Sequence, residues 1–219
     1  MISIIKKKNI NNNFIIDNNT KSVGKKFLNL NKESIAFLGP LYSYSHLATL
    51  TYINNFFFKK KIINVSCQNF SEIFFCIKQG LIKLAIVPIY NNITGVVKEV
   101  FDLLKINSIY LHVRKVFELP IKHCLVSNKK IFLNKIKKIY SHSEPFKQCN
   151  FFIRQNPSWE LKSCSSTSFA MKIIKNYSSE EIAAIGNEKA AIFYKLYILK
   201  KNISNKKNNK TTFLVLKKN

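Results

Sequence analysis

The apolar residues of this chain fall into short runs separated by polar turns. Compact runs rich in Ile, Val, Ala and Phe, some of them ended by Gly or Pro, predict strands at residues 35–40, 65–70, 84–89, 109–116, 122–126, 139–141, 161–163, 182–186 and 211–216. The stretches between them, several opened by Ser, predict helices at residues 45–57, 71–80, 95–105, 146–154, 166–175 and 187–193. This alternation indicates an α/β fold with mainly parallel sheets.

The first 33 residues do not share this pattern. They are rich in Lys and Asn and carry only short apolar patches, such as residues 14–16. We expect residues 1–33 to form a basic extension that is poorly ordered or weakly helical, and residues 34–219 to form the folded domain.

Polar residues collect where the predicted strands end. These groups are Ser43-Tyr44-Ser45-His46, Asn91-Asn92, Ser141-His142 and Ser166-Thr167-Ser168. In open α/β sheets, ligands bind at the carboxyl ends of the strands. Helices that start there offer free backbone N–H groups, which suit carboxylates. The pattern therefore predicts a site for a small, anionic, oxygen-rich ligand.

The charge adds little to this picture. The 219 residues carry 36 basic and 11 acidic side chains, for a net charge of +25. Arg114 and Arg154 are the only arginines, although Arg is the residue that clamps phosphates and reads bases in a bidentate manner. Lys, Asn, Ile and Phe are inflated together, as in an AT-rich genome. We therefore rank a basic nucleic-acid binder third among the hypotheses and expect no specific nucleic-acid partner.

Cysteine and histidine usage points to no metal site. The five cysteines are odd in number and lack CxxC spacing, and the four histidines are scattered. Lys83 interrupts the most apolar stretch, and the N-terminus has no apolar signal core, so we expect neither a membrane segment nor secretion. A reducing, cytoplasmic location is the expectation.

Several short segments, in order over residues 35–216, resemble the motifs of prephenate dehydratases. Residues 35–46 resemble the opening FLGPxGSYSH motif, and residues 87–95 resemble VPIENSxxG. Further along are likenesses to YSHPQPxxQC at residues 140–149, to the STSxA turn at 165–170, to AAIG(S/N) at 183–187 and to TRF at 211–213. The nearest kin are dehydratase domains of bifunctional chorismate mutase–prephenate dehydratases.

The resemblance implies a two-lobed α/β fold, like type II periplasmic binding proteins, with the active site in the cleft between the lobes. Lobe 1 is expected at about 34–108 and 203–219, and lobe 2 at about 109–202. The implied activity is a carbon–oxygen lyase (hydro-lyase) reaction in L-phenylalanine biosynthesis. Prephenate loses CO2 and water to give phenylpyruvate, with no cofactor or metal.

The resemblance also implies site residues. Thr211 matches the threonine proposed to assist departure of the ring hydroxyl. Substrate-binding positions fall at Ser43, Tyr90, Asn91, Ser141, Gln148, Thr167, Ser168 and Phe213. Without the resemblance, Thr211 in a strand suits a structural role, Gln148 suits a solvent-exposed position, and Ser166 to Ser168 suit a plain helix cap.

The chain departs from the family motifs at four positions. Tyr90 stands for the VPIENS glutamate, Thr212 for the TRF arginine, Tyr42 for a glycine and Glu144 for a glutamine. Loss of an acid–base partner typically costs about 10²–10⁴ in rate, so we expect a slower enzyme rather than an inactive one. A positive φ at Tyr42 implies strain of about 1–3 kcal/mol.

Two further expectations concern organisation. No mutase helical domain and no regulatory ACT domain fit within the 219 residues, so we expect a monofunctional enzyme without feedback inhibition by phenylalanine, forming a homodimer. The main alternative is a two-lobed protein of the same fold that binds an aromatic acid and has lost turnover. His46 and His142 are expected to position turns, because no carboxylate or nucleophile is spaced to form a triad with either.

Overall fold

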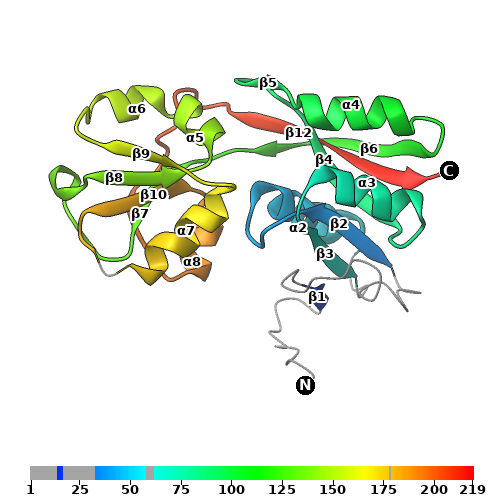
Figure 1. The fold of residues 1–219 in the computed structure, drawn as a ribbon, viewed down its shortest axis with the longest axis horizontal. Coiled ribbons are helices and arrows are strands. Elements are labelled where there is room, and N and C mark those ends of the chain that lie inside the picture. Colours follow the sequence, from blue (N-terminus) through cyan, green and yellow to red (C-terminus); the bar gives the residue numbers. More distant parts are fainter. Residues whose placement is uncertain (1–13, 17–32, 58–61, 178) are drawn as a thin grey trace.

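The computed structural model describes residues 14–16, 33–57, 62–177 and 179–219. Two β-sheets, each with helices packed on both faces, form two lobes that lie side by side (Figure 1). The chain builds most of the first sheet, crosses to the second lobe after β6, and returns to add β12 to the first sheet.

The first sheet has the strand order β1-β3-β2-β4-β12-β6, with β5 paired to β4. Its strands are β1 (Phe14–Ile16), β2 (Ser34–Leu38), β3 (Ile63–Cys67), β4 (Leu84–Asn91), β5 (Gly95–Val96), β6 (Leu111–Pro120) and β12 (Lys210–Lys218). The strands from β1 to β4 on this path are parallel, whereas β12 runs antiparallel to both β4 and β6. Because successive side chains point to opposite faces, each central strand contributes side chains to the hydrophobic cores on both faces of the sheet.

Three helices cover the first sheet. Helix α2 (Tyr44–Phe56) packs on one face against a core that includes Ile35, Ile86 and Phe213. Helices α3 (Phe70–Lys78) and α4 (Lys98–Asn107) pack on the other face against Ala36, Val87 and their neighbours.

The second sheet has the order β11-β7-β10-β8-β9. Its strands are β7 (Cys124–Ser127), β8 (Lys138–Ser141), β9 (Glu160–Ser163), β10 (Ile182–Gly186) and β11 (Tyr197–Lys200). Helices α7 (Thr167–Asn176) and α8 (Glu188–Phe193) cover one face, while α5 (Ser143–Gln148), α6 (Asn150–Arg154) and a 3-10 turn at Leu133–Lys135 lie on the other.

The expected two-lobed α/β fold, like type II periplasmic binding proteins, is confirmed. Apart from β1 at the edge of the first sheet, the parallel strands of each sheet follow the order second, first, third, and the strand beside the third is antiparallel to it. The sheets are therefore mixed rather than mainly parallel, because β7 and β12, the first strands after each crossing between the lobes, run against their neighbours.

Four local predictions need correction. Residues 14–16 form β1 within the expected extension; the rest of residues 1–32 lies outside the described part. Strand β6 hydrogen bonds to β12, so the first sheet extends beyond residue 108. Strand β11 was not predicted, and one predicted helix at 146–154 is two short helices beginning at Ser143.

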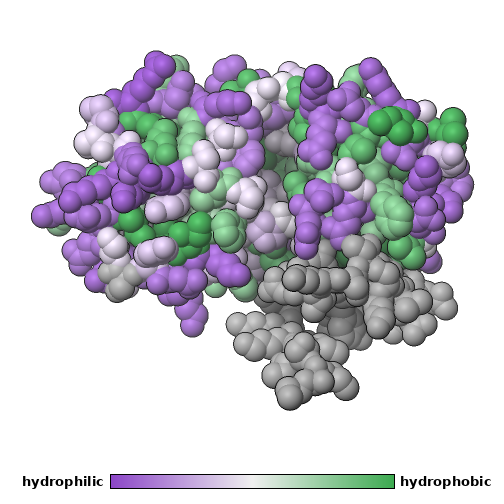
Figure 2. All heavy atoms as spheres, viewed as in Figure 1, coloured by the Kyte–Doolittle hydropathy of each residue, from purple (hydrophilic) through white to green (hydrophobic). Residues whose placement is uncertain are grey.

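Hydrophilic side chains are spread over both lobes on the face shown in Figure 2, with apolar residues scattered among them. Within the described residues, no helix combines the length and apolar character that crossing a membrane requires.

Candidate active site between the lobes

A cleft of about 280 Å³ opens between the two lobes. The first lobe contributes the loop after β2, the end of β4 and the start of β12, and the second contributes α5, the segment before β7 and the start of α7. Its polar lining residues are Ser43, Tyr44, Ser45, Asn91, Thr94, His123, His142, Glu144, Gln148, Ser165, Ser166, Thr167 and Thr211. The cleft therefore lies at the carboxyl ends of β2 and β4, where this fold class binds ligands.

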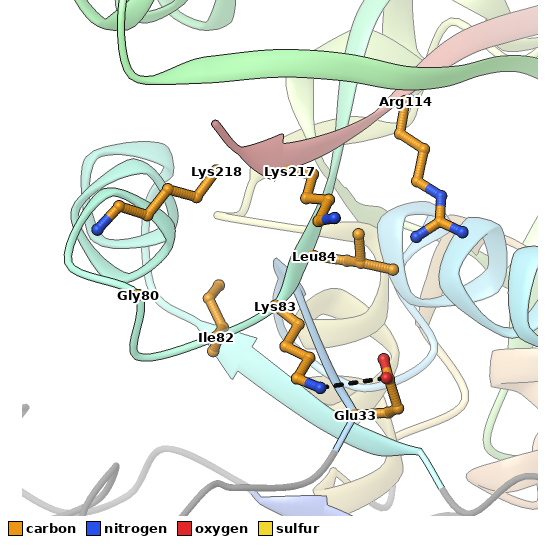
Figure 3. A pocket seen from close by; sticks show the side chains of 8 residues that line it. All are labelled: Glu33, Gly80, Ile82, Lys83, Leu84, Arg114, Lys217 and Lys218. Carbon is orange, nitrogen blue, oxygen red and sulfur yellow. Dashed lines mark hydrogen bonds and ion pairs between the residues drawn. The ribbon is translucent and has the colours of Figure 1, made fainter.

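A second cavity, of about 380 Å³, lies in the first lobe (Figure 3). Basic side chains dominate it, including Lys83, Arg114 and Lys217, and Lys83 pairs with Glu33 at 3.2 Å. It shares no lining residue with the cleft, and none of the sequence-predicted site residues lines it. The candidate site is therefore the cleft.

Six of the nine predicted site residues line the cleft together. They are Ser43, Asn91, Gln148, Thr167, Thr211 and Phe213. All six are buried, although they come from both lobes and span 171 positions of the sequence from 43 to 213. Phe213 forms an apolar wall and stacks on Phe117, with ring centroids 5.9 Å apart.

The other three predicted residues do not line the cleft. Ser141 is fully buried and its Oγ donates to the carbonyl of Ile185 at 2.9 Å, so it ties β8 to the end of β10. Ser168 is also fully buried, and its Oγ donates to the carbonyl of Leu41 at 2.6 Å. Both serine hydroxyl groups therefore bind backbone carbonyls, and neither lines the cavity.

Tyr90 is the third residue outside the cleft. Its side chain is 45% exposed, and in the β4–β12 ladder it stands directly opposite Thr212. These are the positions where the family motifs carry glutamate and arginine, so two of the four departures form one cross-strand pair. Opposite charges at such a pair contribute about 0.2–1 kcal/mol. Replacing both together leaves no unpaired charge.

Asn91 organises the first-lobe wall of the cleft. Its Oδ1 accepts hydrogen bonds from the backbone N–H groups of Ile93 (2.9 Å) and Thr94 (3.1 Å). Its Nδ2 carries two protons, which are shared among three acceptors: Asn209 Oδ1 at 2.8 Å, Thr211 Oγ1 at 2.9 Å and the carbonyl of Lys210 at 3.0 Å. The Thr211 oxygen therefore already accepts one hydrogen bond, and its own proton is available to a ligand.

Gln148 organises the second-lobe wall. Its Oε1 lies 2.7 Å from Asn209 Nδ2 and 2.8 Å from His123 Nε2. The other ring nitrogen of His123 lies 3.1 Å from the Tyr44 hydroxyl. Burial lowers the pKa of His123 to about 4, against a smaller opposing effect of the Gln148 hydrogen bond, so the ring is neutral at pH 7.

Sequence reasoning missed His123 and Asn209 as parts of this site, whereas Tyr44 lies in one of the polar groups that it singled out. The partners of His123 and Asn209 lie 25 to 118 positions away in the sequence, so spacing carries no signal. The one usable signal was placement: His123 and Asn209 lie in the two segments where the chain crosses between the lobes.

Two helices begin at the cleft, one from each lobe. Ser43 caps α2 by accepting from the N–H of His46, and Ser166 caps α7 by accepting from the N–H of Phe169. The positive end of each helix dipole therefore faces the cavity and favours a carboxylate. Among the described residues that line the cleft, Glu144 is the single carboxylate, and Lys147 pairs with it at 2.8 Å. The site suits a ligand with two carboxylates.

His46 and His142 act in turns, as expected. His46 Nδ1 accepts the backbone N–H of Tyr42 at 2.9 Å, and burial lowers the pKa of His46 to about 4. His142 caps α5 by accepting from the N–H of Glu144 at 3.2 Å, and burial also lowers its pKa. His46 does not line the cleft, whereas His142 does.

Tyr42 holds the strained backbone that the sequence suggested. Its φ is +63°, a region that costs a residue with a side chain about 1–2 kcal/mol. Its ring stacks on Phe193 of the second lobe with centroids 4.1 Å apart, and its carbonyl accepts from Asn187 Nδ2 at 2.7 Å. These contacts offset the strain and join the two lobes.

No group of three or more His, Cys, Asp or Glu side chains within the described ranges is placed to hold a metal ion. The donors that the cleft offers are neutral hydroxyl, amide and backbone groups. Such a set can bind and orient an oxygen-rich anion and can hydrogen bond to a departing oxygen.

Known proteins resemble this chain in both sequence and structure. It is 38% identical over 214 residues to the bifunctional chorismate mutase/prephenate dehydratase of Buchnera aphidicola subsp. Schizaphis graminum, covering 98% of this chain and 52% of that protein. The counterpart in Buchnera aphidicola subsp. Acyrthosiphon pisum is 42% identical over 202 residues, covering 91% of this chain and 51% of that protein. This chain thus spans about half the length of these curated relatives.

Solved structures support the fold. The prephenate dehydratase of Arthrobacter aurescens in complex with L-Phe superposes with a TM-score of 0.74 at 22% identity, covering 85% of this chain and 60% of that one. The enzyme of Staphylococcus aureus gives 0.69 at 24% identity, covering 85% and 66%. The sequence model of the family described as prephenate dehydratase matches residues 35–219. The chain belongs to the prephenate dehydratase family.

Proposed function

We propose that this chain converts prephenate to phenylpyruvate, with loss of CO2 and water. The observation that carries the proposal is the joint placement of Asn91, Thr211 and Gln148 in one cleft. Two helix N-termini, one from each lobe, face the same cavity and supply sites for two carboxylates.

The proposed roles follow from the hydrogen bonds. The Ser43 hydroxyl already donates to the carbonyl of Leu38 at 2.9 Å, so the carboxylates of the substrate bind the backbone N–H groups at the two helix starts, beside Ser43 and Thr167. Phe213 packs against the ring of the substrate. The bond from the ring to its carboxylate breaks, its electron pair completes the aromatic ring, and the bond to the ring hydroxyl breaks. One proton, which the overall reaction takes up from solvent, must reach that oxygen for it to leave as water. The Thr211 hydroxyl, oriented by Asn91, donates a hydrogen bond to it.

The replacement of the family glutamate by Tyr90 fits this proposal. Tyr90 is exposed and faces Thr212 across the strands rather than the cleft. We therefore assign the lost glutamate–arginine pair to sheet stability and not to the reaction, and we expect turnover to survive its loss.

The proposal has further parts that follow from the family. The enzyme is a carbon–oxygen lyase of L-phenylalanine biosynthesis that acts in the cytoplasm without a cofactor. Residues 34–219 form its dehydratase domain, residues 1–33 are an extension, and the chain forms a homodimer. Sedimentation of the purified chain tests the dimer directly.

The test of the activity is phenylpyruvate formation from prephenate at neutral pH, compared among the wild-type chain, Thr211→Ala and Thr211→Ser. A sample without enzyme corrects for spontaneous decomposition of prephenate. Thr51→Ala is the matched control, because the Thr51 hydroxyl bonds only within α2 and does not line the cleft.

We expect Thr211→Ala to lower kcat about 10²–10⁴-fold, Thr211→Ser to retain most activity, and Thr51→Ala to match the wild type. Absence of turnover in the wild-type chain, with prephenate still bound, contradicts the proposal and favours a binding protein. Equal losses of kcat in Thr211→Ala and Thr51→Ala would show that Thr211 takes no part in the chemistry.

A further inference from the structure

The chain of hydrogen bonds that joins the lobes can run in only one direction. It begins at the backbone N–H groups of Ile93 and Thr94, which meet one side-chain atom of Asn91. Backbone N–H groups can only donate, so that atom must be the amide oxygen. The other end of the Asn91 amide is therefore the –NH2 group, which must act as the donor toward the side chains that it contacts.

Asn209 accepts a hydrogen bond from Asn91 and donates one to Gln148. The Asn91 –NH2 group lies 2.8 Å from one end of the Asn209 amide, which must be its oxygen. The Asn209 –NH2 group then faces Gln148 at 2.7 Å and requires an acceptor there. The Gln148 amide is thereby oriented with its oxygen toward Asn209, although Gln148 lies in the other lobe.

The orientation of Gln148 fixes the groups on both of its sides. Its oxygen accepts a second hydrogen bond from His123 Nε2 at 2.8 Å, so the neutral ring carries its proton on Nε2. His123 Nδ1 then carries no proton, and the Tyr44 hydroxyl 3.1 Å away shares its one proton between this nitrogen and the carbonyl of Lys122, which lies 2.9 Å from the same hydroxyl. The –NH2 group of Gln148 has no partner among the described hydrogen bonds and belongs to a residue that lines the cleft.

We propose that Asn209 is a positioning residue that holds the Gln148 carboxamide with its –NH2 group toward the substrate. The proposal rests on the dehydratase function proposed above. With this orientation, Gln148 and Thr211 both present donors to a substrate whose polar groups are carboxylates and a departing hydroxyl. With the amide reversed, the Gln148 oxygen faces those negative oxygens and repels them.

The backbone at Asn209 is held independently of its side chain. Its carbonyl accepts from the N–H of Ile121, so the two crossing segments are joined through main-chain atoms. The side chain is 2% exposed, and within the described part of the chain its hydrogen bonds go to Asn91 and Gln148. A substitution that changes only the amide therefore tests orientation rather than the path of the chain.

The test is Asn209→Asp, which keeps the acceptor toward Asn91 and replaces the donor toward Gln148 by an oxygen. Asn208→Asp is the matched control, since it adds the same charge one position away on an exposed side chain. We expect Asn209→Asp to lower kcat at least about tenfold with KM changed less than about threefold, and Asn208→Asp to stay within about twofold of the wild type.

A second arm asks whether Asn209 acts through Gln148. In a Gln148→Ala background, Asn209→Asp should lower kcat no further, because the group it positions is gone. A further loss equal to that in the wild-type background overturns the proposal, since it assigns the effect to charge or folding. Equal rates for Asn209→Asp and Asn208→Asp overturn it as well.

A third arm does not depend on turnover. Nitrogen NMR of the histidine rings at pH 7 should find His123 protonated at Nε2 in the wild-type chain, and this state should change in Asn209→Asp but not in Asn208→Asp. His123 protonated at Nδ1 in the wild-type chain overturns the proposal. If the wild-type chain shows no dehydratase activity while the Nε2 proton is found, the proposed function fails and the orientation of the amide stands.

Discussion

The two lobes are joined at the cleft by two contacts of opposite construction. The amide junction runs through side chains only, from Asn91 through Asn209, Gln148 and His123 to Tyr44. The carbonyl junction uses the backbone carbonyls of Leu41 and Tyr42, which accept from side chains of the second lobe, and a ring stack between Tyr42 and Phe193.

The difference explains where the chain has departed from its family. In the amide junction, the identity of each side chain decides which group faces the substrate. In the carbonyl junction, the first lobe contributes carbonyl oxygens that every residue has, so Tyr42 can replace a glycine. Tyr90 and Thr212 lie in neither junction, on an exposed ladder. Four predictions test this division.

The largest effect is expected on activity when the amide junction is changed at Gln148. Glutamate at this position still accepts from Asn209 and His123, so the fold is kept, but an oxygen replaces the –NH2 group that faces the substrate. We expect Gln148→Glu to lower kcat/KM about 10²–10³-fold with an unchanged melting temperature. Gln155→Glu, on an exposed residue at the end of α6, should have no effect on turnover. Near-normal turnover by Gln148→Glu would place the reacting groups elsewhere.

One buried histidine, His123, belongs to the amide junction, and another, His46, accepts the N–H of Tyr42 beside the carbonyl junction. Burial lowers the pKa of each to about 4. Unfolded histidine takes up its proton near pH 6.5, so between these values the unfolded state binds more protons. Stability should therefore fall as the pH is lowered from about 6.5 to about 4, by up to about 1.4 kcal/mol per pH unit for each histidine.

Urea unfolding between pH 7 and pH 5 measures this dependence. His123→Phe and His46→Phe should each remove about half of the slope that the two residues contribute. If neither variant changes the slope of stability against pH, both rings take up their protons as readily in the folded protein as in the unfolded one.

The carbonyl junction should respond in stability rather than in chemistry. Tyr42→Ala removes the stack on Phe193 but keeps the positive φ, whereas Tyr42→Gly removes both the stack and the strain. We expect Tyr42→Gly to be about 1 kcal/mol more stable than Tyr42→Ala in urea unfolding. Gly80→Ala, at a positive φ with no crowding closer than 3.7 Å, should cost a similar amount and calibrates the strain. If the two Tyr42 variants are equally stable, the backbone there is unstrained.

The smallest effect is expected on the exposed ladder. Tyr90→Glu and Thr212→Arg should together restore a cross-strand ion pair, with a coupling of about 0.2–1 kcal/mol in a double-mutant cycle and kcat within about twofold of the wild type. A rise in kcat of more than about tenfold for Tyr90→Glu alone would show that a carboxyl group at this position takes part in the reaction.

Much of the fold was predictable because each central strand is a short apolar run bounded by a turn. The predictions failed where pairing partners decided the outcome. Phe14 to Ile16 become a strand by pairing with β3, and β6 joins the first sheet because β12 returns to lie beside it. Neither partner is adjacent in the sequence.

The site was predictable for residues that follow strands or begin helices, such as Asn91 and Thr167. Ser141 and Ser168 were also expected at the cleft and do not line it, because motif position does not reveal which way a small hydroxyl turns. Both serines bond to backbone carbonyls instead of the cavity. Asn209 was missed because its role depends on two residues in different lobes.

Strand β12 lies between β4 and β6 in the first sheet, yet it follows the entire second lobe in the sequence. On a ribosome, every strand of the second sheet emerges before β12 does. The second lobe can therefore complete its sheet before β12 is available to pair with β4 and β6. Asn209 and Thr211 arrive with that strand, so the nascent chain acquires this wall of the cleft only after every strand of the second lobe has emerged.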